Sequence, residues 1–271
     1  MFRPITLAAL LALTAPPAFA QTQAEVLSGE ILPGWRTGAT THMSALHLAL
    51  APEWKTYWRS PGEAGIPPVF DWSGSQNVQS VRLYWPRPQV FEVSGMQSIG
   101  YRHDLVLPIE ITAKNPGQPI RLRGSADLGV CRDICMPATL DLAADLPAPG
   151  AAGGAMPDPV INAALRARPS SGREAGLVAI SCQVEAIADG LRLTATLQLP
   201  TTGGAETVVL EPGQPAIWVS EARTTRKGDR LTATADLVAG NGAPFALDRS
   251  AVTVTVLGRD RAVEIFGCPA P

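Results

Sequence analysis

The segment 120–146 carries two cysteines, Cys131 and Cys135, between two stretches in which apolar and polar residues alternate. Before the pair, Ile120 and Leu122 alternate with arginines, and a similar alternation follows it. A period of two is typical of a strand with one buried face. The pattern therefore predicts two strands that meet at a Cys-x-x-x-Cys hairpin tip. A thiol pair in that position is open to a partner's sulfur, as reversible thiol–disulfide exchange requires.

The first 20 residues have the three parts of a secretory signal peptide. Arg3 supplies the positive charge, residues 5–13 form the apolar run, and residues 18–20 are an A-x-A cleavage sequence. The apolar run is too short for a membrane anchor and is followed by two prolines. We therefore expect residues 1–20 to be removed and the mature chain to be exported and soluble.

The length and composition favour two domains built from strands and turns. The chain has 271 residues, with 25 glycines and 25 prolines, and helical periodicity is scarce. The formal net charge is −2 and no basic block occurs, which argues against a nucleic-acid-binding protein. The sequence also lacks a Gly-rich phosphate loop, a His-x-x-x-His metal helix and a Gly-x-Ser-x-Gly elbow.

The distribution of turn residues predicts a first domain over 21–148, a linker over 149–172 and a second domain over 173–271. Asp158 and Pro159 form a helix start, so we expect a short helix within the linker. The expected fold is all-β: two immunoglobulin-like β-sandwich domains joined by a Pro/Gly/Ala-rich linker with a short helix.

The first domain is predicted to contain several short strands before the cysteine hairpin, within 40–50, 54–58, 66–72, 78–85 and 104–112. Residues 91–101 lack a clear period and are expected to form a loop. Trp54, Tyr57 and Trp58 are interpreted as core residues of the sandwich. In the second domain, strands are predicted within 177–187, 191–199, 207–210, 216–220, 231–237, 252–257 and 262–266.

Four cysteines in an exported chain indicate two disulfides. Three pairings are open, and the domain layout favours Cys131–Cys135 together with Cys182–Cys268, one pair in each domain. A staple as short as the first constrains the unfolded chain little, which favours a redox-active role over a structural one. The second pair would instead act as a structural disulfide that holds the C-terminus on its domain.

Three segments resemble the N-terminal periplasmic domain of the DsbD family of thiol:disulfide interchange proteins. They resemble the related domain of the copper-suppressor ScsB proteins more closely still. The segments are GWRTGATTHMSALHLALAPEWKTYWRSPGEAGIPPVFDWSG, YWPRPQVFEVSGMQSIGYRHDLVLPIEI and GVCRDICMP, within residues 34–146. DsbD proteins space their two cysteines further apart than this chain does.

The resemblance implies a periplasmic thiol:disulfide oxidoreductase of the carrier kind, with an immunoglobulin-like fold and no cofactor. Such a domain passes electrons from a membrane partner to periplasmic thioredoxin-fold proteins. The chain stops after the second β-unit, so the expected donor is a separate membrane protein of the DsbD or CcdA type. By the match, Cys135 forms the mixed disulfide with partners and Cys131 resolves it. A residue of a flexible loop shields the disulfide in the family, and the matching segment offers Phe91, Met96 and Tyr101 as cap residues.

Two other functions stay open at this point. A copper-binding or copper-tolerance protein is one, because soft ligands are present: Met43, Met96, Met136, His42, His47 and His103. His42 and His47 lie five residues apart, so on one strand they face opposite sides, which argues against a joint metal site. The other is a non-catalytic assembly module in which both disulfides are structural.

Overall fold

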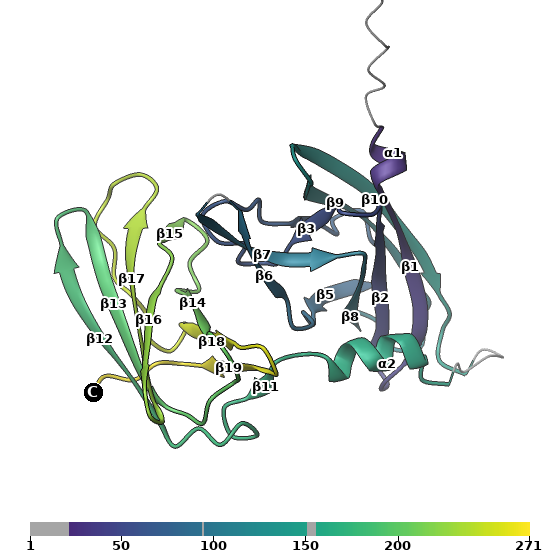
Figure 1. Ribbon diagram of the computed structural model, residues 1–271. Coiled ribbons are helices and arrows are strands. Elements are labelled where there is room, and N and C mark those ends of the chain that lie inside the picture. Colours follow the sequence, from purple (N-terminus) through teal and green to yellow (C-terminus); the bar gives the residue numbers. More distant parts are fainter. Residues whose placement is uncertain (1–21, 94, 151–155) are drawn as a thin grey trace, which may run out of the picture.

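The computed structural model describes residues 22–93, 95–150 and 156–271. The predicted signal peptide, residues 1–20, lies outside the described residues, and so does 151–155 of the predicted linker. The described chain forms two β-sandwiches side by side (Figure 1). The all-β, immunoglobulin-like fold is therefore confirmed. Within these three ranges, no helix is long and apolar enough to cross a bilayer.

The first sheet of the first sandwich follows a four-residue helix, α1 (Gln23–Val26). Its four antiparallel strands have the order β1 (Leu27–Arg36), β2 (Thr41–Leu50), β8 (Asp104–Ala113) and β5 (Val78–Leu83). Leu46, Leu48, Leu107 and Ile109 are at most 1 % exposed, because alternate residues of β2 and β8 point at the second sheet.

The second sheet carries the cysteines. Its strands have the order β10 (Cys135–Leu146), β9 (Ile120–Cys131), β3 (Lys55–Tyr57), β7 (Met96–Arg102) and β6 (Gln89–Val93), and β4 (Val69–Asp71) pairs with β9. One face of this sheet packs on the first sheet through residues such as Trp58, Ile99 and Val130. Its other face points away from that core and holds the candidate site.

Residues 91–101 are not a loop, and that prediction is wrong. They belong to the β6–β7 hairpin, in which Phe91 is opposite Ser98. Gly100 interrupts the alternation of apolar and polar residues that would indicate a strand. It lies opposite Tyr57, and a Cβ there would come within 2.0 Å of the Thr56 carbonyl oxygen. The close approach of two backbones requires a glycine where a strand pattern would place a side chain.

The short helix is present as α2 (Pro159–Arg166), and the Asp158 carboxylate caps its first turn through the backbone amides of Val160 and Ile161. The helix packs on the outer face of the first sheet, where Ile161 contacts the buried residues Met43 and Ala45. It therefore covers the face of β2 that points away from the sandwich core (Figure 1).

The second sandwich also has two sheets. One has the order β11 (Ser170–Ser171), β19 (Ala262–Phe266), β18 (Thr253–Leu257) and β14 (Thr207–Glu211). The other has the order β12 (Ala179–Ile187), β13 (Gly190–Gln198), β17 (Arg230–Ala239) and β15 (Ile217–Val219), and β16 (Arg223–Lys227) also pairs with β17.

An ion triad joins the two sandwiches. Arg59, just after β3, donates two hydrogen bonds of 2.8 Å to the Glu211 carboxylate and a further one to Glu264. Burial disfavours the Arg59 cation, but the two carboxylates outweigh it and hold its pKa above the ordinary value. Val209 and Leu257 of the second sandwich also pack against the core of the first. The strand that carries Tyr57 is thus anchored at one end to the second sandwich.

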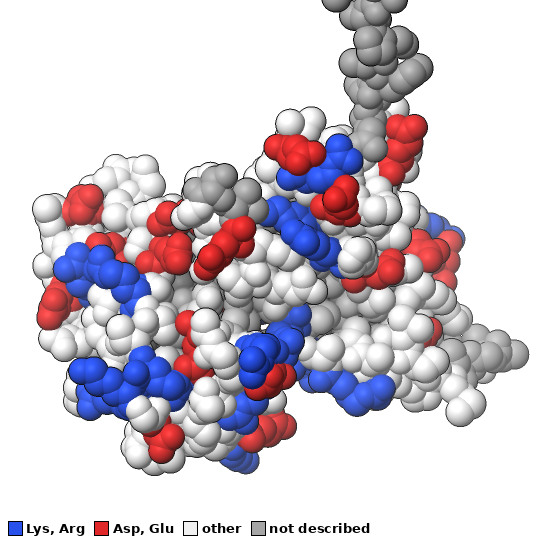
Figure 2. Space-filling view, in the orientation of Figure 1, with Lys and Arg blue, Asp and Glu red and all other residues white. Residues whose placement is uncertain are grey.

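The surface shows no extended region of one charge on the face in Figure 2, where Lys and Arg are interspersed with Asp and Glu. This agrees with the formal net charge of −2 for the whole chain. Nothing on this face resembles the basic stripe by which proteins bind a phosphate backbone.

Candidate redox site

Cys131 is the last residue of β9 and Cys135 is the first residue of β10. The two are cross-strand partners, with 4.1 Å between their Cα atoms, and a disulfide joins them. The predicted hairpin tip is confirmed. Since the bond connects residues that the ladder already places together, opening it leaves both strands in register through the eleven cross-strand pairs beyond it.

The two halves of the disulfide differ in exposure. Cys131 is 1 % exposed, whereas Cys135 is exposed to solvent. The turn between them, residues 132–134, is exposed as well, and Ile134 is 70 % exposed. Cys135 is therefore accessible from solvent, while Cys131 is covered by the protein.

Tyr57 covers the buried sulfur. Its hydroxyl donates a hydrogen bond of 2.9 Å to Cys131 Sγ and lies 3.6 Å from Cys135 Sγ. Burial raises the pKa of Tyr57, so the phenol stays protonated and remains a donor. The tyrosine ring packs against Gly129, and a Cβ at that position would come within 3.1 Å of Tyr57 Cδ2.

Tyr57 is buried, as the sequence predicts, with 2 % of its surface exposed, but it lies outside the sandwich core. Trp54 and Trp58 do belong to the sandwich core, but Tyr57 points to the opposite face of the sheet, where it meets the sulfurs. The alternation of side-chain direction along a strand could have indicated that Tyr57 faces away from Trp54 and Trp58. Positions 54 and 58 have the same parity, and position 57 has the other.

A buried lysine lies beside the cysteines. Lys55 is directly opposite Cys131 in the β3–β9 ladder and is 9 % exposed. Its ammonium group donates a hydrogen bond of 2.9 Å to Ser98 Oγ and lies 5.2 Å from the centre of the Phe91 ring. Burial, and after it the charge of Arg102, lower the pKa of Lys55. No pattern in the sequence indicates a function for this residue.

The three predicted cap residues lie in different environments. Phe91 is 8 % exposed, between the Lys55 ammonium group and the Arg102 guanidinium group, whose centre is 4.7 Å from the ring centre. Met96 is 56 % exposed at the start of β7. Tyr101 lies in the sandwich core, where its hydroxyl donates to the Pro86 carbonyl oxygen at 2.8 Å. Of the three, Phe91 shares its neighbour Lys55 with Cys131, and Tyr101 faces away from the sulfurs.

The second disulfide joins Cys182 of β12 to Cys268, which follows β19. Both residues are at most 1 % exposed and belong to the hydrophobic core of the second sandwich. The Cys182 backbone amide also donates to the Pro269 carbonyl oxygen at 2.7 Å. The bond thus ties the C-terminal segment to the first long strand of this sandwich.

The soft residues considered for copper are dispersed. His42 is buried with Nε2 2.6 Å from the Pro33 carbonyl oxygen, and burial lowers its pKa. His47 lies on the same strand, with ring nitrogens 3.4 Å from carboxylate oxygens of Glu30 and Asp104. Over the ranges that the structure describes, no three His, Cys, Asp or Glu side chains form a metal-binding group.

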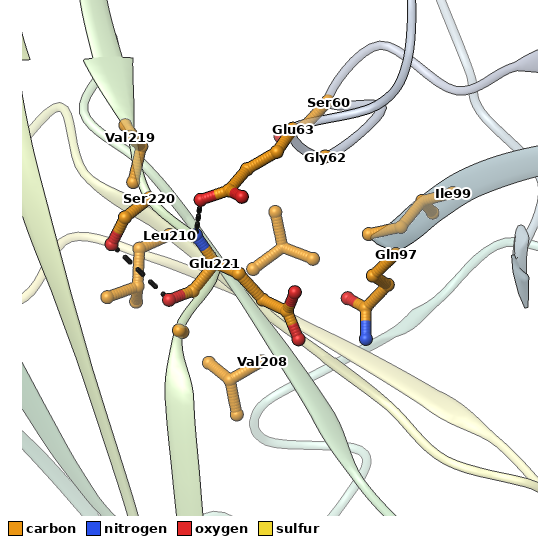
Figure 3. A pocket seen from close by; sticks show the side chains of 12 residues that line it. Ser60, Gly62, Glu63, Gln97, Ile99, Val208, Leu210, Val219, Ser220 and Glu221 are labelled. Atoms are coloured by element: carbon orange, nitrogen blue, oxygen red, sulfur yellow. Dashed lines mark hydrogen bonds between the residues drawn. The ribbon is translucent and has the colours of Figure 1, made fainter. Parts of the chain in front are cut away.

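A small pocket lies at the seam of the two sandwiches (Figure 3). The first sandwich contributes Gly62, Glu63 and Gln97, and the second contributes residues of β14 and 219–222. The Glu63 carboxylate accepts a hydrogen bond of 3.1 Å from the Glu221 backbone amide across the seam. Neither cysteine of the candidate redox pair lines this pocket, so it is separate from the candidate redox site.

Comparisons with known proteins relate part of this chain to one family. Residues 28–147 match the family described as "Thiol:disulfide interchange protein DsbD, N-terminal". The N-terminal periplasmic domain of ScsB from Proteus mirabilis has a similar structure, with a TM-score of 0.63 and 26 % identity, over 90 % of this chain and 92 % of that one. No curated protein matches in a sequence comparison. Residues 28–147 therefore match the N-terminal domain of the DsbD family of thiol:disulfide interchange proteins, and the fold of the chain is similar to that of the ScsB domain.

Proposed function

We propose that this protein is a periplasmic thiol–disulfide carrier. In this role the reduced Cys131/Cys135 pair passes two electrons to an oxidised thioredoxin-fold protein and is reduced again by a membrane donor of the DsbD or CcdA type. The observation that carries the proposal is the asymmetry of the disulfide, with Cys135 exposed and Cys131 buried under the Tyr57 hydroxyl. The predicted signal peptide, residues 1–20, supports the location.

The exposed cysteine is the nucleophile in the proposed cycle. The Cys135 thiolate attacks one sulfur of the partner's disulfide, and the partner's other sulfur leaves as a thiolate. The Cys131 thiolate then attacks Cys135 Sγ, which restores the bond inside the carrier and releases the partner as a dithiol. Two electrons pass to the partner, and the carrier ends as the disulfide described here.

Reduction of the carrier runs through the same bonds in reverse. The donor's thiolate attacks the exposed Cys135 sulfur, the bond to Cys131 breaks, and Cys131 leaves as a thiolate beside the Tyr57 hydroxyl. A second donor thiolate then attacks the donor's own sulfur in the mixed disulfide, which closes a disulfide in the donor and releases Cys135 as a thiolate. Both directions therefore use Cys135 as the contact with partners and Cys131 as the internal sulfur.

Trapping of the mixed disulfide tests this assignment. Reduced Cys131→Ser, incubated with an oxidised thioredoxin-fold protein and analysed on non-reducing gels, should accumulate a covalent complex because no internal thiol resolves it. Cys135→Ser should trap little, and the double serine variant is the control. Trapping by Cys135→Ser alone would reverse the roles, and trapping by neither variant would contradict the carrier function.

A further inference from the structure

Lys55 is a buried cation whose charge is not matched by a carboxylate in the described parts of the chain. No Asp or Glu oxygen there lies within 4.0 Å of its nitrogen, and its hydrogen-bond partner is the neutral Ser98 hydroxyl. Lysines are rarely buried unless they are paired, because removing an ammonium group from water is unfavourable. A nearby anion would therefore stabilise the Lys55 ammonium group. While the neighbouring disulfide is closed, the described residues provide no such anion.

We propose that the Lys55 ammonium group is the counter-ion of the thiolate that forms on Cys131 when the Cys131–Cys135 disulfide opens. The inference rests on the proposed carrier function, in which this bond opens and closes in every cycle. It adds to that function a residue that sets how readily the buried sulfur carries negative charge.

The register of the sheet supports the pairing. Lys55 and Cys131 are direct cross-strand partners, and the side chains of such partners lie on one face with Cβ atoms about 5 Å apart. Tyr57, two residues along β3, lies on the same face and touches Cys131 Sγ. The Lys55 nitrogen is 5.9 Å from the centre of the Tyr57 ring. The ammonium group, the phenol and the buried sulfur thus share one side of β3 and β9.

The other charged groups near Lys55 do not supply a buried cation beside Cys131 in its place. Arg102 is its partner on β7, but it is exposed and its guanidinium group lies over the Phe91 ring. In the turn after Cys131, Arg132 pairs with Asp133 at 3.0 Å, and both are exposed. Lys55 is therefore the desolvated cation on this face, and its field is screened less than that of the exposed arginines.

The positive charge of Lys55 acts in the step that breaks the Cys131–Cys135 bond. A partner thiolate attacks Cys135 Sγ and forms a new S–S bond, while the bond to Cys131 breaks and its electron pair stays on Cys131 Sγ. A cation beside the leaving sulfur stabilises that negative charge, so the leaving thiol has a lower pKa and departs faster. In the opposite direction, the same cation increases the fraction of Cys131 present as the resolving thiolate.

Single-cysteine variants test the pairing without a partner protein. In full-length Cys135→Ser, the thiolate absorbance of Cys131 is followed against pH, with and without Lys55→Met. We expect Lys55→Met to raise the pKa of the Cys131 thiol by about 1 or more, and Lys55→Arg to restore most of the effect. In Cys131→Ser, the same change should alter the pKa of Cys135 less. Lys114→Met, at an exposed lysine, is the control and should change neither.

The outcomes separate this inference from the carrier function. An unchanged Cys131 pKa in Lys55→Met would overturn it, even if trapping through Cys135 succeeds. Equal changes at both cysteines would overturn the specific pairing with Cys131. If Lys55→Met does not fold, Lys55→Gln takes its place. A second readout is the equilibrium of the Cys131–Cys135 disulfide with glutathione, measured in the protein that keeps both cysteines, with and without the change at Lys55: loss of the cation should favour the disulfide above the thiol pKa.

Discussion

The two disulfides of this protein have opposite environments. Cys182 and Cys268 are both buried in an apolar core and lie 86 residues apart in the sequence. Cys131 and Cys135 lie four residues apart, one of them is exposed, and a tyrosine hydroxyl donates to the other. Both pairs belong to one chain, so neither the number of cysteines in the chain nor its cellular compartment can explain the difference between them. The two bonds therefore differ in access to one sulfur and in the polar groups beside the other, and this difference supports the proposed division into a reactive and a structural pair.

The two disulfides also differ in how much they are expected to stabilise the folded protein. In the chain-entropy model, closing the loop of 86 residues restricts the unfolded chain by about 4.5 kcal/mol, whereas the short loop at the redox site restricts it by about 2 kcal/mol. In the proposed cycle, the Cys131–Cys135 bond therefore opens at a smaller loss of stability, and β9 and β10 remain paired beyond it.

The largest expected effect is on the stability of the second sandwich. The double variant Cys182→Ala/Cys268→Ala should lower the free energy of unfolding by up to about 4.5 kcal/mol, measured by urea denaturation. Cys131→Ala/Cys135→Ala is the matched control and should lower it by about 2 kcal/mol or less. Equal losses in the two double variants would remove the distinction between a structural and a reactive pair.

The next effect concerns the rate of reduction. Limited treatment with a dithiol, followed by alkylation and peptide mass analysis, should label Cys131 and Cys135 first. Cys182 and Cys268 react only after a local opening, and an opening of about 3 kcal/mol slows reduction by about a hundredfold. Labelling of both pairs at similar rates would show that burial does not protect the second disulfide.

The smallest effect isolates one hydrogen bond. Tyr57→Phe removes the hydroxyl that touches Cys131 Sγ, a loss of about 1 kcal/mol, and should slow thiol exchange about fivefold. Burial raises the pKa of Tyr57 above its ordinary value of about 10, so the hydroxyl stays protonated near neutral pH and the effect should not change there. Tyr84→Phe, away from the sulfurs, is the control. An unchanged exchange rate in Tyr57→Phe would mean that the hydroxyl does not stabilise the sulfur.

The sequence predicted the features that depend on local pattern. The hairpin at Cys131 and Cys135, the helix start at Asp158 and most strands follow from alternation, turn residues and capping. The residues around the sulfurs were harder to predict because they come from β3, β6 and β7, which the chain order does not place beside β9. The sequence did not separate Tyr57 from the core residues Trp54 and Trp58, and Lys55 has no local signal, since its position beside Cys131 depends on the strand opposite it.

The ion triad of Arg59 has a consequence for how the protein is divided. The family match ends at residue 147, yet Glu211 and Glu264, the anions that neutralise Arg59, lie far beyond it. A fragment cut at the family boundary would keep the cation two residues after Tyr57 and lose both of its carboxylates. In electrostatic terms, the smallest intact piece that contains the redox strand is larger than the domain that sequence families recognise. A transplant of this domain into another protein therefore needs a substitute for those two carboxylates or a neutral residue at position 59.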